Sequence, residues 1–272
     1  MMNPFQPFAV KITKIIDETP TIKTFVLDLL GNKFSFDAGQ FIELTVPGVG
    51  EAPFTPSSSP YIKDTLEMTI MKVGRVTSAL FEKKVGDILA IRGPFGKRYP
   101  IEKFEKKEVL ILGGGVGLAP LRSLFLALAE NIKKYGKIYI KYGARTPQDI
   151  VYKYQIPEWQ TWKGVDVDLS VDVGNNAWKG KIGVVTILLE NSLPNPQEMV
   201  AVVCGPPIMM KFGTIKLLEK GFKGSNIYLS MEKNMSCGIG QCGHCRCGRY
   251  FVCKDGPVLT WDQIKDIEDP FL

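Results

Sequence analysis

Four cysteines near the C-terminus have a spacing that is typical of iron–sulfur proteins. Five of the six cysteines in the chain lie between positions 237 and 253. Thiolates hold both ferric and ferrous iron, and Cys-x4-Cys-x2-Cys is how plant-type ferredoxin motifs begin. The sequence therefore predicts a [2Fe–2S] cluster with four thiolate ligands, spaced as Cys237-x4-Cys242-x2-Cys245-x7-Cys253.

Zinc is the main alternative occupant of these cysteines. Structural zinc usually takes two Cys-x2-Cys pairs, whereas four residues separate the first pair here. A Rieske centre needs two histidines, and His244 is the only one in the chain. We therefore favour iron, with His244 as a loop residue that tunes or shields the cluster. Cys247 is expected to point away and not to be a ligand.

A glycine run in the middle of the chain predicts a phosphate-binding turn. In VLILGGGVGLAPLRSLF, a buried strand meets a helix at Gly113, Gly114, Gly115 and Gly117. Backbone N–H groups and the positive end of the helix bind phosphates at such turns, and glycine permits close approach. Glycine-rich turns are common in α/β proteins, but the strand before and the helix after favour dinucleotide binding.

Cys204 ends another expected strand, MVAVVCGPP. The carboxyl edge of a doubly wound sheet is where ligands bind. A lone cysteine is more usually a small buried core residue. Both interpretations of Cys204 stay open from the sequence.

Two segments of the first hundred residues carry side chains that could bind a ligand with an aromatic ring system and phosphate groups. Phe54 could pack on an aromatic ring, and hydroxyls follow it in EAPFTPSSSP. The second segment, GRVTSAL, offers backbone and hydroxyl donors. All of them are also ordinary turn and strand residues. The residues concerned are Phe54, Thr55, Ser57, Ser58, Gly74, Thr77 and Ser78.

The elements that would position these residues fall into three regions. From Phe8 to about Arg92, short alternating runs such as FIELTV and LEMTIMKV predict antiparallel strands of a small barrel. From Glu108 onward, buried strands alternate with helices, which indicates a parallel sheet covered on both faces. From about Lys233 the pattern breaks into Cys- and Gly-rich loops, followed by a short helix near TWDQIKDI.

Composition sets the broad class. The 272 residues are 45% hydrophobic and 23% charged, as in ordinary globular proteins. No stretch approaches a membrane span, and MMNPFQPFAV does not resemble a secretory signal, so we expect a cytoplasmic protein. The net charge of +6 comes from scattered lysines, which gives no support to nucleic-acid binding.

Taken in order, these segments resemble the ferredoxin–NADP reductase superfamily over almost the whole chain. The matching motifs are GRVTSAL, GGGVGLAP with Ser123 behind it, YGARTP and the late CGP. The tail, CGIGQCGHC…VCKDGPV, is similar to gamma subunits of cytoplasmic sulfhydrogenases or NAD(P)-linked hydrogenases. It also resembles the electron-transfer subunit of dihydroorotate dehydrogenase and the B subunit of anaerobic sulfite reductase.

The resemblance implies a multidomain β plus α/β fold. Residues 1–102 would form a Greek-key β-barrel that binds FAD, and residues 103–230 a five-stranded parallel α/β domain that binds NAD(P)H. Residues 231–272 would be a small loop domain that carries the [2Fe–2S] cluster. The implied cofactor contacts are Pro53, Phe54, Thr55, Ser57, Ser58, Gly74, Arg75, Thr77, Ser78, Gly113, Gly114, Gly115, Gly117, Ala119, Pro120, Arg145, Cys204, Gly205 and Pro206.

The implied function is electron transfer between NAD(P)H and a partner redox subunit of a hydrogenase-like complex. Cys204, the residue expected to be catalytic, would lie near the nicotinamide, which is the reacting group. Arg145 favours NADP(H) because a cation there could pair with a ribose phosphate. The family's flavin motif begins with an arginine where this chain has Glu51-Ala52-Pro53, so Arg75 becomes a candidate for neutralising the phosphates. The alternatives are a free-standing reductase and a zinc-stapled binding module without catalysis.

Overall fold

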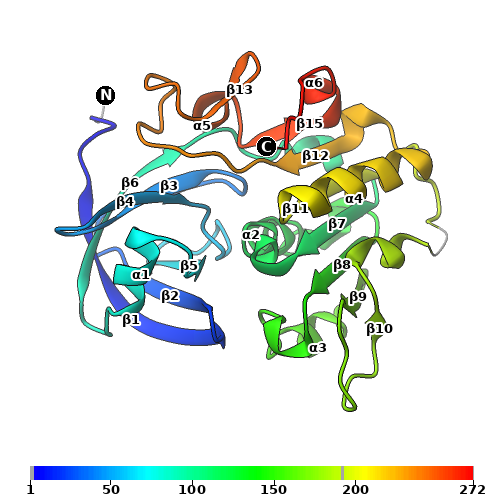
Figure 1. The fold of residues 1–272 in the computed structure, drawn as a ribbon, viewed down its shortest axis with the longest axis horizontal. Helices are drawn as coiled ribbons and strands as arrows, with labels where there is room; N and C mark the ends of the chain where they lie inside the picture. The colour runs from blue at the N-terminus through cyan, green and yellow to red at the C-terminus, as the bar shows by residue number, and fades with distance from the viewer. Residues whose placement is uncertain (1–2, 191–192, 272) are drawn as a thin grey trace.

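Two large β-sheets lie side by side, and the C-terminal segment, which has a small two-stranded sheet of its own, crosses above both (Figure 1). The computed structural model describes residues 3–190 and 193–271. In Figure 1 the first sheet, in blue and cyan, lies at the left, and the second, with colours from green to orange-red, lies at the right. Among the described residues, no helix combines the length and apolar character needed to cross a membrane.

The first sheet has six antiparallel strands in the order β4-β3-β6-β1-β2-β5. Alternating apolar side chains such as Val10, Ile12 and Leu44 are buried in its core. Strand β4 was not predicted, and its proline suits its edge position because no ladder N–H is lost there. Helix α1 (Arg75–Phe81) packs against β3 and β4. The strands are β1 (Phe8–Thr19), β2 (Ile22–Asp28), β3 (Phe41–Val46), β4 (Gly50–Phe54), β5 (Thr65–Met71) and β6 (Ile88–Phe95).

The second sheet has seven strands in the order β10-β9-β8-β7-β11-β12-β15. Its five central strands are parallel, as predicted. The two-residue β10 and the antiparallel three-residue β15 extend its edges; both are too short for a periodic pattern to reveal. The strands are β7 (Val109–Gly114), β8 (Ile138–Ala144), β9 (Val165–Val171), β10 (Lys181–Ile182), β11 (Val200–Cys204), β12 (Ile227–Ser230) and β15 (Val258–Thr260).

Helices cover both faces of this sheet, because successive side chains of a strand point to opposite sides. On β7, Ile111 packs in the cluster that contains α2 (Leu118–Ala129), and Leu112 packs in the one that contains α4 (Pro207–Glu219). The remaining helical segments are short. They are α3 (Ile156–Trp159), η1 (Ile101–Phe104), η2 (Gly115–Gly117), η3 (Ile132–Lys134), η4 (Pro147–Asp149), η5 (Val185–Leu189) and η6 (Gly224–Asn226).

The C-terminal segment is joined to both sheets. Its strand β15 pairs with β12 of the second sheet, and the N–H of Lys97, just after β6, donates to the Gly256 carbonyl. The predicted domain boundaries after residues 102 and 230 stay predictions, and β15 is a sheet strand beyond the second of them. The segment also contains β13 (Arg246–Cys247), β14 (Tyr250–Phe251), α5 (Val252–Asp255) and the predicted short helix α6 (Trp261–Ile264).

Arg122 on α2 fastens the second domain to the barrel. Its Nη1 donates to the Ser57 carbonyl at 2.7 Å and to Glu67 Oε2 at 2.5 Å, and its Nε donates to Gln155 at 2.9 Å. The guanidinium also lies 4.8 Å from the ring centroid of Tyr152. Because the side chain of Arg122 is only 6% exposed, this ion pair is little screened by water.

We expect Arg122→Met to lower the free energy of unfolding by about 2–4 kcal/mol, because it leaves Glu67 without its buried partner. Thermal unfolding of the holoprotein measures this as a fall in Tm. Arg98→Met is the matched control: Arg98 is 45% exposed in its pair with Glu102, so at most about 1 kcal/mol is expected. Equal losses in the two variants would contradict a special role for Arg122.

Candidate functional site

The cysteine loop aims backbone N–H groups at sulfur. Cys237 Sγ accepts from the N–H of Ile239, Gln241 and Cys242, at N···S distances of 3.5, 3.3 and 3.5 Å. Cys253 Sγ accepts from Gly240 at 3.1 Å. Such donors stabilise negative charge on sulfur, as a bound iron–sulfur cluster requires.

Backbone hydrogen bonds link the four predicted ligands as two pairs. The N–H of Cys242 donates to Cys237 Sγ at 3.5 Å, and the N–H of Cys253 donates to Cys245 Sγ at 3.4 Å. Within residues 3–190 and 193–271, no three Cys, His, Asp or Glu side chains gather around one point as single-ion ligands. Two thiolate pairs fit a two-iron centre, in which each iron takes two protein ligands.

The local environment shifts the pKa values of two of these thiols in opposite directions. Burial raises the pKa of Cys237, but the N–H groups of Cys242, Ile239 and Gln241 outweigh it and lower that pKa to about 6. Burial, together with the hydrogen bond from Cys245, raises the pKa of Cys253 to about 12. Cys242 is exposed, whereas the other three are buried, so the cluster site reaches the surface at Cys242.

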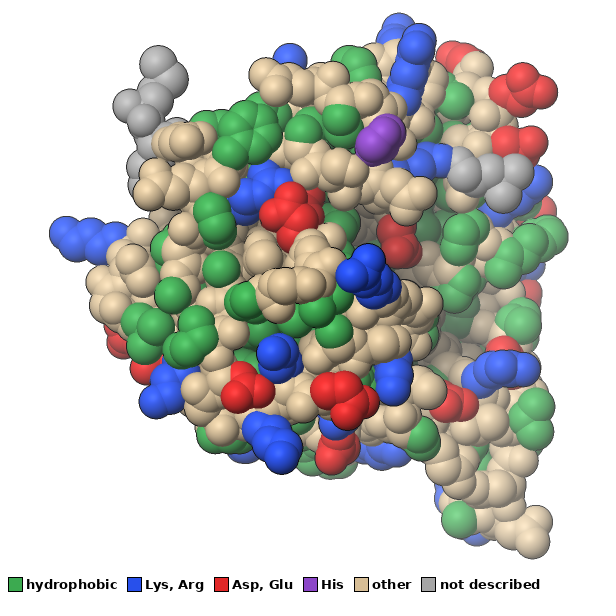
Figure 2. Space-filling model, turned by 60° about the vertical axis from the view of Figure 1, so that its left-hand side comes forward, with side chains coloured by type: hydrophobic (Ala, Val, Ile, Leu, Met, Phe, Trp, Pro, Cys, Tyr) green, Lys and Arg blue, Asp and Glu red, His purple; other side chains and the backbone are tan. Residues whose placement is uncertain are grey.

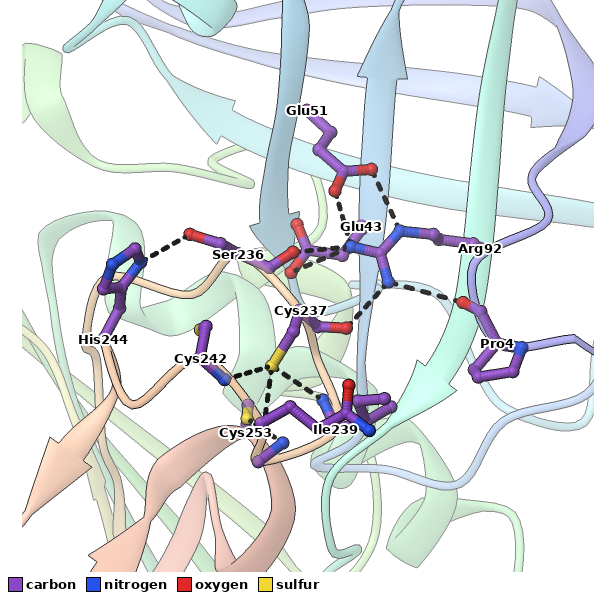
Figure 3. Close-up of polar contacts among 12 residues, drawn as sticks. Pro4, Glu43, Glu51, Arg92, Ser236, Cys237, Ile239, Cys242, His244 and Cys253 are labelled. Atoms are coloured by element: carbon purple, nitrogen blue, oxygen red, sulfur yellow. Dashed lines mark hydrogen bonds and ion pairs between the residues drawn. The ribbon is translucent and has the colours of Figure 1, made fainter.

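The other two residues of the cysteine region are placed as predicted. The Cys247 thiol is buried and points to the Pro270 carbonyl at 3.7 Å. His244 lies in an exposed loop, where its Nδ1 is 2.9 Å from the Ser236 hydroxyl (Figure 3). Both observations agree with ligation by the other four cysteines.

Arg92 on β6 connects the barrel to this loop (Figure 3). It binds both carboxylate oxygens of Glu51 on β4, and it donates to the carbonyls of Ser236 at 2.8 Å and Cys237 at 2.9 Å. Its Nη2 also lies 4.0 Å from Glu43 Oε1. Sequence reasoning missed Arg92 and Glu43; Glu51, where the family has an arginine, was the only signal.

Glu43 is a buried carboxyl group that lacks hydrogen-bond partners and has only a distant cation, Arg92, to balance its charge. Its side chain is fully buried, and neither carboxylate oxygen has a hydrogen-bond partner. Burial raises the pKa of Glu43 to about 8, although the Arg92 cation opposes the shift; Glu51 adds to it. At neutral pH this carboxyl is therefore mostly protonated.

The two segments predicted to hold a flavin are brought together by the barrel. Pro53 and Phe54 end β4, and Gly74 is the N-cap of α1, which packs against the same strand. Phe54 and Thr55 are half-buried, and a Cβ built on Gly74 would meet no atom within 4 Å. Arg75 is exposed beside it. A half-buried aromatic ring beside open space fits a ring-bearing ligand with phosphates.

Three hydroxyls predicted to contact the flavin already have protein partners. Ser57 Oγ lies 3.1 Å from the Glu67 carbonyl, and Ser58 Oγ accepts from the Glu67 N–H at 3.1 Å. Thr77 Oγ1 accepts from the N–H groups of Val73 and Gly74 at the start of α1. Ser78 is half-buried on the same helix. The roles of these residues toward a flavin stay predictions.

The predicted nucleotide-binding turn meets the end of β11. Gly113 is in register with Cys204, and a Cβ on Gly117 would lie 2.5 Å from the Cys204 carbonyl oxygen. Gly115, by contrast, has a φ of +55° and open space around it. Glycine is therefore required for packing at position 117, and it leaves room for a ligand at position 115.

The other predicted nucleotide contacts surround this turn. Ala119 is buried on α2 and Pro120 is half-buried, while Gly205 and Pro206 lead from β11 into α4. Burial raises the pKa of Cys204 to about 12, so its thiol is protonated and is no base. Arg145 is exposed directly after β8, the neighbour of β7. These contacts also stay predictions.

Two hollows lie elsewhere on the described surface. One of about 540 Å³ lies along residues 28–35 and 63–64, and one of about 250 Å³ lies along residues 35–40, 60–63 and 98–101 and reaches Ala127 of α2. On the face in Figure 2, basic side chains are scattered among acidic and apolar ones, and form no continuous basic surface. The site is thus the set of three binding elements that β4, β7 and the cysteine loop provide.

An antiparallel barrel followed by a parallel α/β domain with a glycine turn defines a ferredoxin–NADP reductase-like fold. A solved structure of an NADH-dependent reduced ferredoxin–NADP oxidoreductase superposes with a TM-score of 0.74 at 27% identity, covering 94% of this chain and 91% of that one. A ferredoxin NADP+ reductase from Neisseria gonorrhoeae with bound FAD and NADP shares the fold, with a TM-score of 0.72 at 21% identity over 82% and 97% of the two chains.

The chain matches three family models in turn. They describe an oxidoreductase FAD-binding domain (residues 9–99), an oxidoreductase NAD-binding domain (111–214) and the iron–sulfur cluster binding domain of dihydroorotate dehydrogenase B (232–265). The sulfhydrogenase 1 subunit gamma of Pyrococcus furiosus is 36% identical over 96% of this chain and 93% of its own. A probable dihydroorotate dehydrogenase B electron transfer subunit of Methanocaldococcus jannaschii is 34% identical over 97% and 93%.

The chain therefore belongs to the family of ferredoxin–NADP reductase-like electron-transfer subunits that includes these sulfhydrogenase and dihydroorotate dehydrogenase components. It is an oxidoreductase with FAD-binding, NAD-binding and iron–sulfur-binding parts.

The pKa of Glu43 predicts a pH dependence of stability. Because the folded state holds this proton up to about pH 8 and the unfolded state releases it near 4.5, stability falls as pH rises between the two values. The slope is at most about 1.4 kcal/mol per pH unit. We expect the Tm of wild type minus that of Glu43→Gln to fall from pH 5 to 8 and to level off above.

Glu102→Gln is the control for this experiment. Glu102 is exposed, and its own backbone N–H and Arg98 lower its pKa, so its titration lies below that window. Parallel Tm curves for wild type and the Glu43 variant would show that the buried carboxyl does not titrate there.

Proposed function

We propose that this chain is an electron-transfer subunit that uses FAD and a [2Fe–2S] cluster to exchange electrons between NAD(P)H and a partner redox subunit. The observation that carries this is the joining of three binding elements. Arg92 ties the cysteine loop to the flavin-side strand β4, and Arg122 ties the helix that follows the nucleotide turn to the barrel. The flavin-side strand, the nucleotide turn and the cysteine loop are thereby held together by buried contacts.

The chain's own residues hold and orient the reactants. A bound flavin exchanges a hydride with NAD(P)H and passes electrons singly to iron–sulfur centres. Residues 53–55 and the start of α1 bind that flavin. The glycine turn binds the dinucleotide phosphates. Cys204 lies near the nicotinamide, where its thiol stays protonated and contacts the ring without acting as a base. No general base is needed, because hydride transfer moves its proton and electrons together.

The partner is best sought among catalytic and iron–sulfur subunits of a hydrogenase-like complex in the cytoplasm. The sulfhydrogenase 1 gamma subunit, 36% identical over 96% of this chain, supports this choice. Dihydroorotate dehydrogenase electron transfer subunits, at 34% and 35%, make that complex the first alternative, followed by a sulfite reductase and a free-standing ferredoxin reductase. The exposed position of Cys242 supports electron exit there. Isolation from the native organism separates the options, because a stable active monomer would contradict the subunit proposal.

For the dinucleotide we favour NADP(H) over NAD(H). Arg145 is exposed at the carboxyl end of β8, beside the glycine turn that ends β7, where a guanidinium can pair with a ribose phosphate. A comparison of kcat/KM for NADPH and NADH in wild type and Arg145→Ala tests this. An unchanged preference in the variant would contradict it.

The cluster type is tested by replacing each cysteine with serine. We expect wild type to contain two iron and two acid-labile sulfide per chain, and to show the EPR signal of a reduced [2Fe–2S] centre on anaerobic addition of NADPH. Variants at Cys237, Cys242, Cys245 and Cys253 should lose iron. Cys247→Ser, the matched control, should retain it because that thiol points to Pro270. Zinc in place of iron would overturn the proposal.

Gly74→Ala tests the flavin site. A methyl group there meets no protein atom, so the fold should tolerate it, whereas a pyrophosphate in that space should be displaced. We expect at least a tenfold weaker affinity for FAD with unchanged iron content. Val73→Ala, at an adjacent side chain that is 72% exposed, should bind FAD normally. Unchanged FAD affinity in the Gly74 variant would place the pyrophosphate elsewhere.

A further inference from the structure

Arg92 uses every N–H of its guanidinium, although it is only 4% exposed. Nε donates to one carboxylate oxygen of Glu51, and Nη2 donates to the other. Nη2 also donates to the Ser236 carbonyl. Nη1 donates to the carbonyls of Cys237 at 2.9 Å and Pro4 at 3.4 Å. A lysine, with three donors and no planar fork, cannot make this set of bonds.

The partners of Arg92 belong to separate functional segments. Glu51 lies on β4, two residues before Pro53, at the strand that supports the flavin site. Ser236 and Cys237 begin the cysteine loop, and Cys237 is the first predicted cluster ligand. One side chain therefore spans from the flavin-side strand to the cluster loop, as Figure 3 shows.

Aromatic packing holds the same loop in place. The Arg92 guanidinium lies 5.1 Å from the ring centroid of Phe95. The next loop residue, Gly238, has a φ of +76°, and a Cβ built on it would lie 2.9 Å from that ring. The loop thus rests on Phe95 while Arg92 holds its two carbonyls, which leaves the backbone N–H groups of residues 239–242 turned toward the sulfurs.

The charges around Arg92 would also act on a bound cluster. Reduction adds one negative charge to a [2Fe–2S] centre, and a buried cation nearby stabilises it more than an exposed one would. Glu51 opposes this effect from the other side of the guanidinium. Glu43, 4.0 Å from Nη2, is the further acidic group that faces Arg92.

We propose that Arg92 is a positioning residue for electron transfer: it clamps the cluster loop to the flavin-side strand and supplies a buried positive charge that favours the reduced cluster. The inference rests on the proposed function and deepens it. It assigns both the placement of the cluster and part of its reduction potential to one side chain outside the ligand set. Glu51 is the counter-charge that moderates the second effect.

Three variants of the holoprotein separate the clamp from the charge. Arg92→Met removes both, Arg92→Lys keeps the charge without the fork, and Glu51→Gln removes only the counter-charge. The midpoint potential of the cluster is measured by EPR-monitored redox titration. The clamp is measured by hydrogen exchange of the loop amides at Ile239, Gln241 and Cys242, which depends on local opening.

We expect opposite shifts in potential from the two charge changes. Arg92→Met should lower the equilibrium constant for cluster reduction at least tenfold, which is about 59 mV more negative for one electron. Glu51→Gln should shift the potential to more positive values. Arg92→Lys should keep it near wild type while loop exchange becomes several-fold faster. A merely structural arginine would not give shifts of opposite sign.

Arg122→Met is the matched control. Removal of this buried arginine should lower the stability of the protein, but its hydrogen-bond partners are Ser57, Glu67 and Gln155, none of which is in the cysteine loop. It should leave the potential and loop exchange unchanged. If Arg92→Met does not fold, the lysine and Glu51 variants decide. Potentials and exchange rates equal to wild type, or shifts of the same sign at Arg92 and Glu51, would overturn the proposal while the proposed function stands. Wild type without iron would overturn both.

Discussion

The fold depends on the attachment of its last forty residues to two sheets at once. Strand β15 completes the hydrogen bonding of β12, and the Lys97 N–H and Arg92 hold the neighbouring backbone from the barrel side. Each contact fixes the cysteine segment relative to a different cofactor-binding element. Electron transfer between bound groups needs fixed separations, and these attachments supply them without a dedicated linker.

Electrostatics distinguishes the cysteines more than sequence position does. Three N–H donors lower the pKa of Cys237 to about 6, whereas burial raises that of Cys204 to about 12. The same residue type thus favours the thiolate at Cys237 and the neutral thiol at Cys204. Three backbone donors outweigh burial at Cys237, whereas the single N–H of Gly240 does not outweigh it at Cys253, whose pKa is raised to about 12.

Much of this arrangement could be predicted from sequence, because local signals encode it. The cysteine spacing, the glycine turn after a buried strand and the alternation of strands and helices all lie within short windows. They predicted the glycine turn, the cysteine loop and the five central strands, whereas the flavin-binding role of the first region came from the resemblance to a known family. Edge strands β4, β10 and β15 were missed because two to five residues carry no usable period.

The contacts between domains could not be predicted in this way. Arg92 and Cys237 are 145 residues apart, and nothing in IRGPFG distinguishes a buried five-bond arginine from a surface one. Glu43 likewise occupies an alternating strand position that predicts an exposed side chain. The substitution of Glu51 for the family's arginine was visible, but its reason lay in a partner from another strand.

The pairing of β15 with β12 has a consequence for how the chain can evolve. A parallel sheet that ended at β12 would present a row of free N–H and C=O groups, a template for joining another chain. The cysteine segment covers that row as well as carrying the metal ligands. Loss of the cysteine segment would therefore expose β12 as an edge strand that could pair with another chain. A homologue that lost the cluster would still be expected to keep β15.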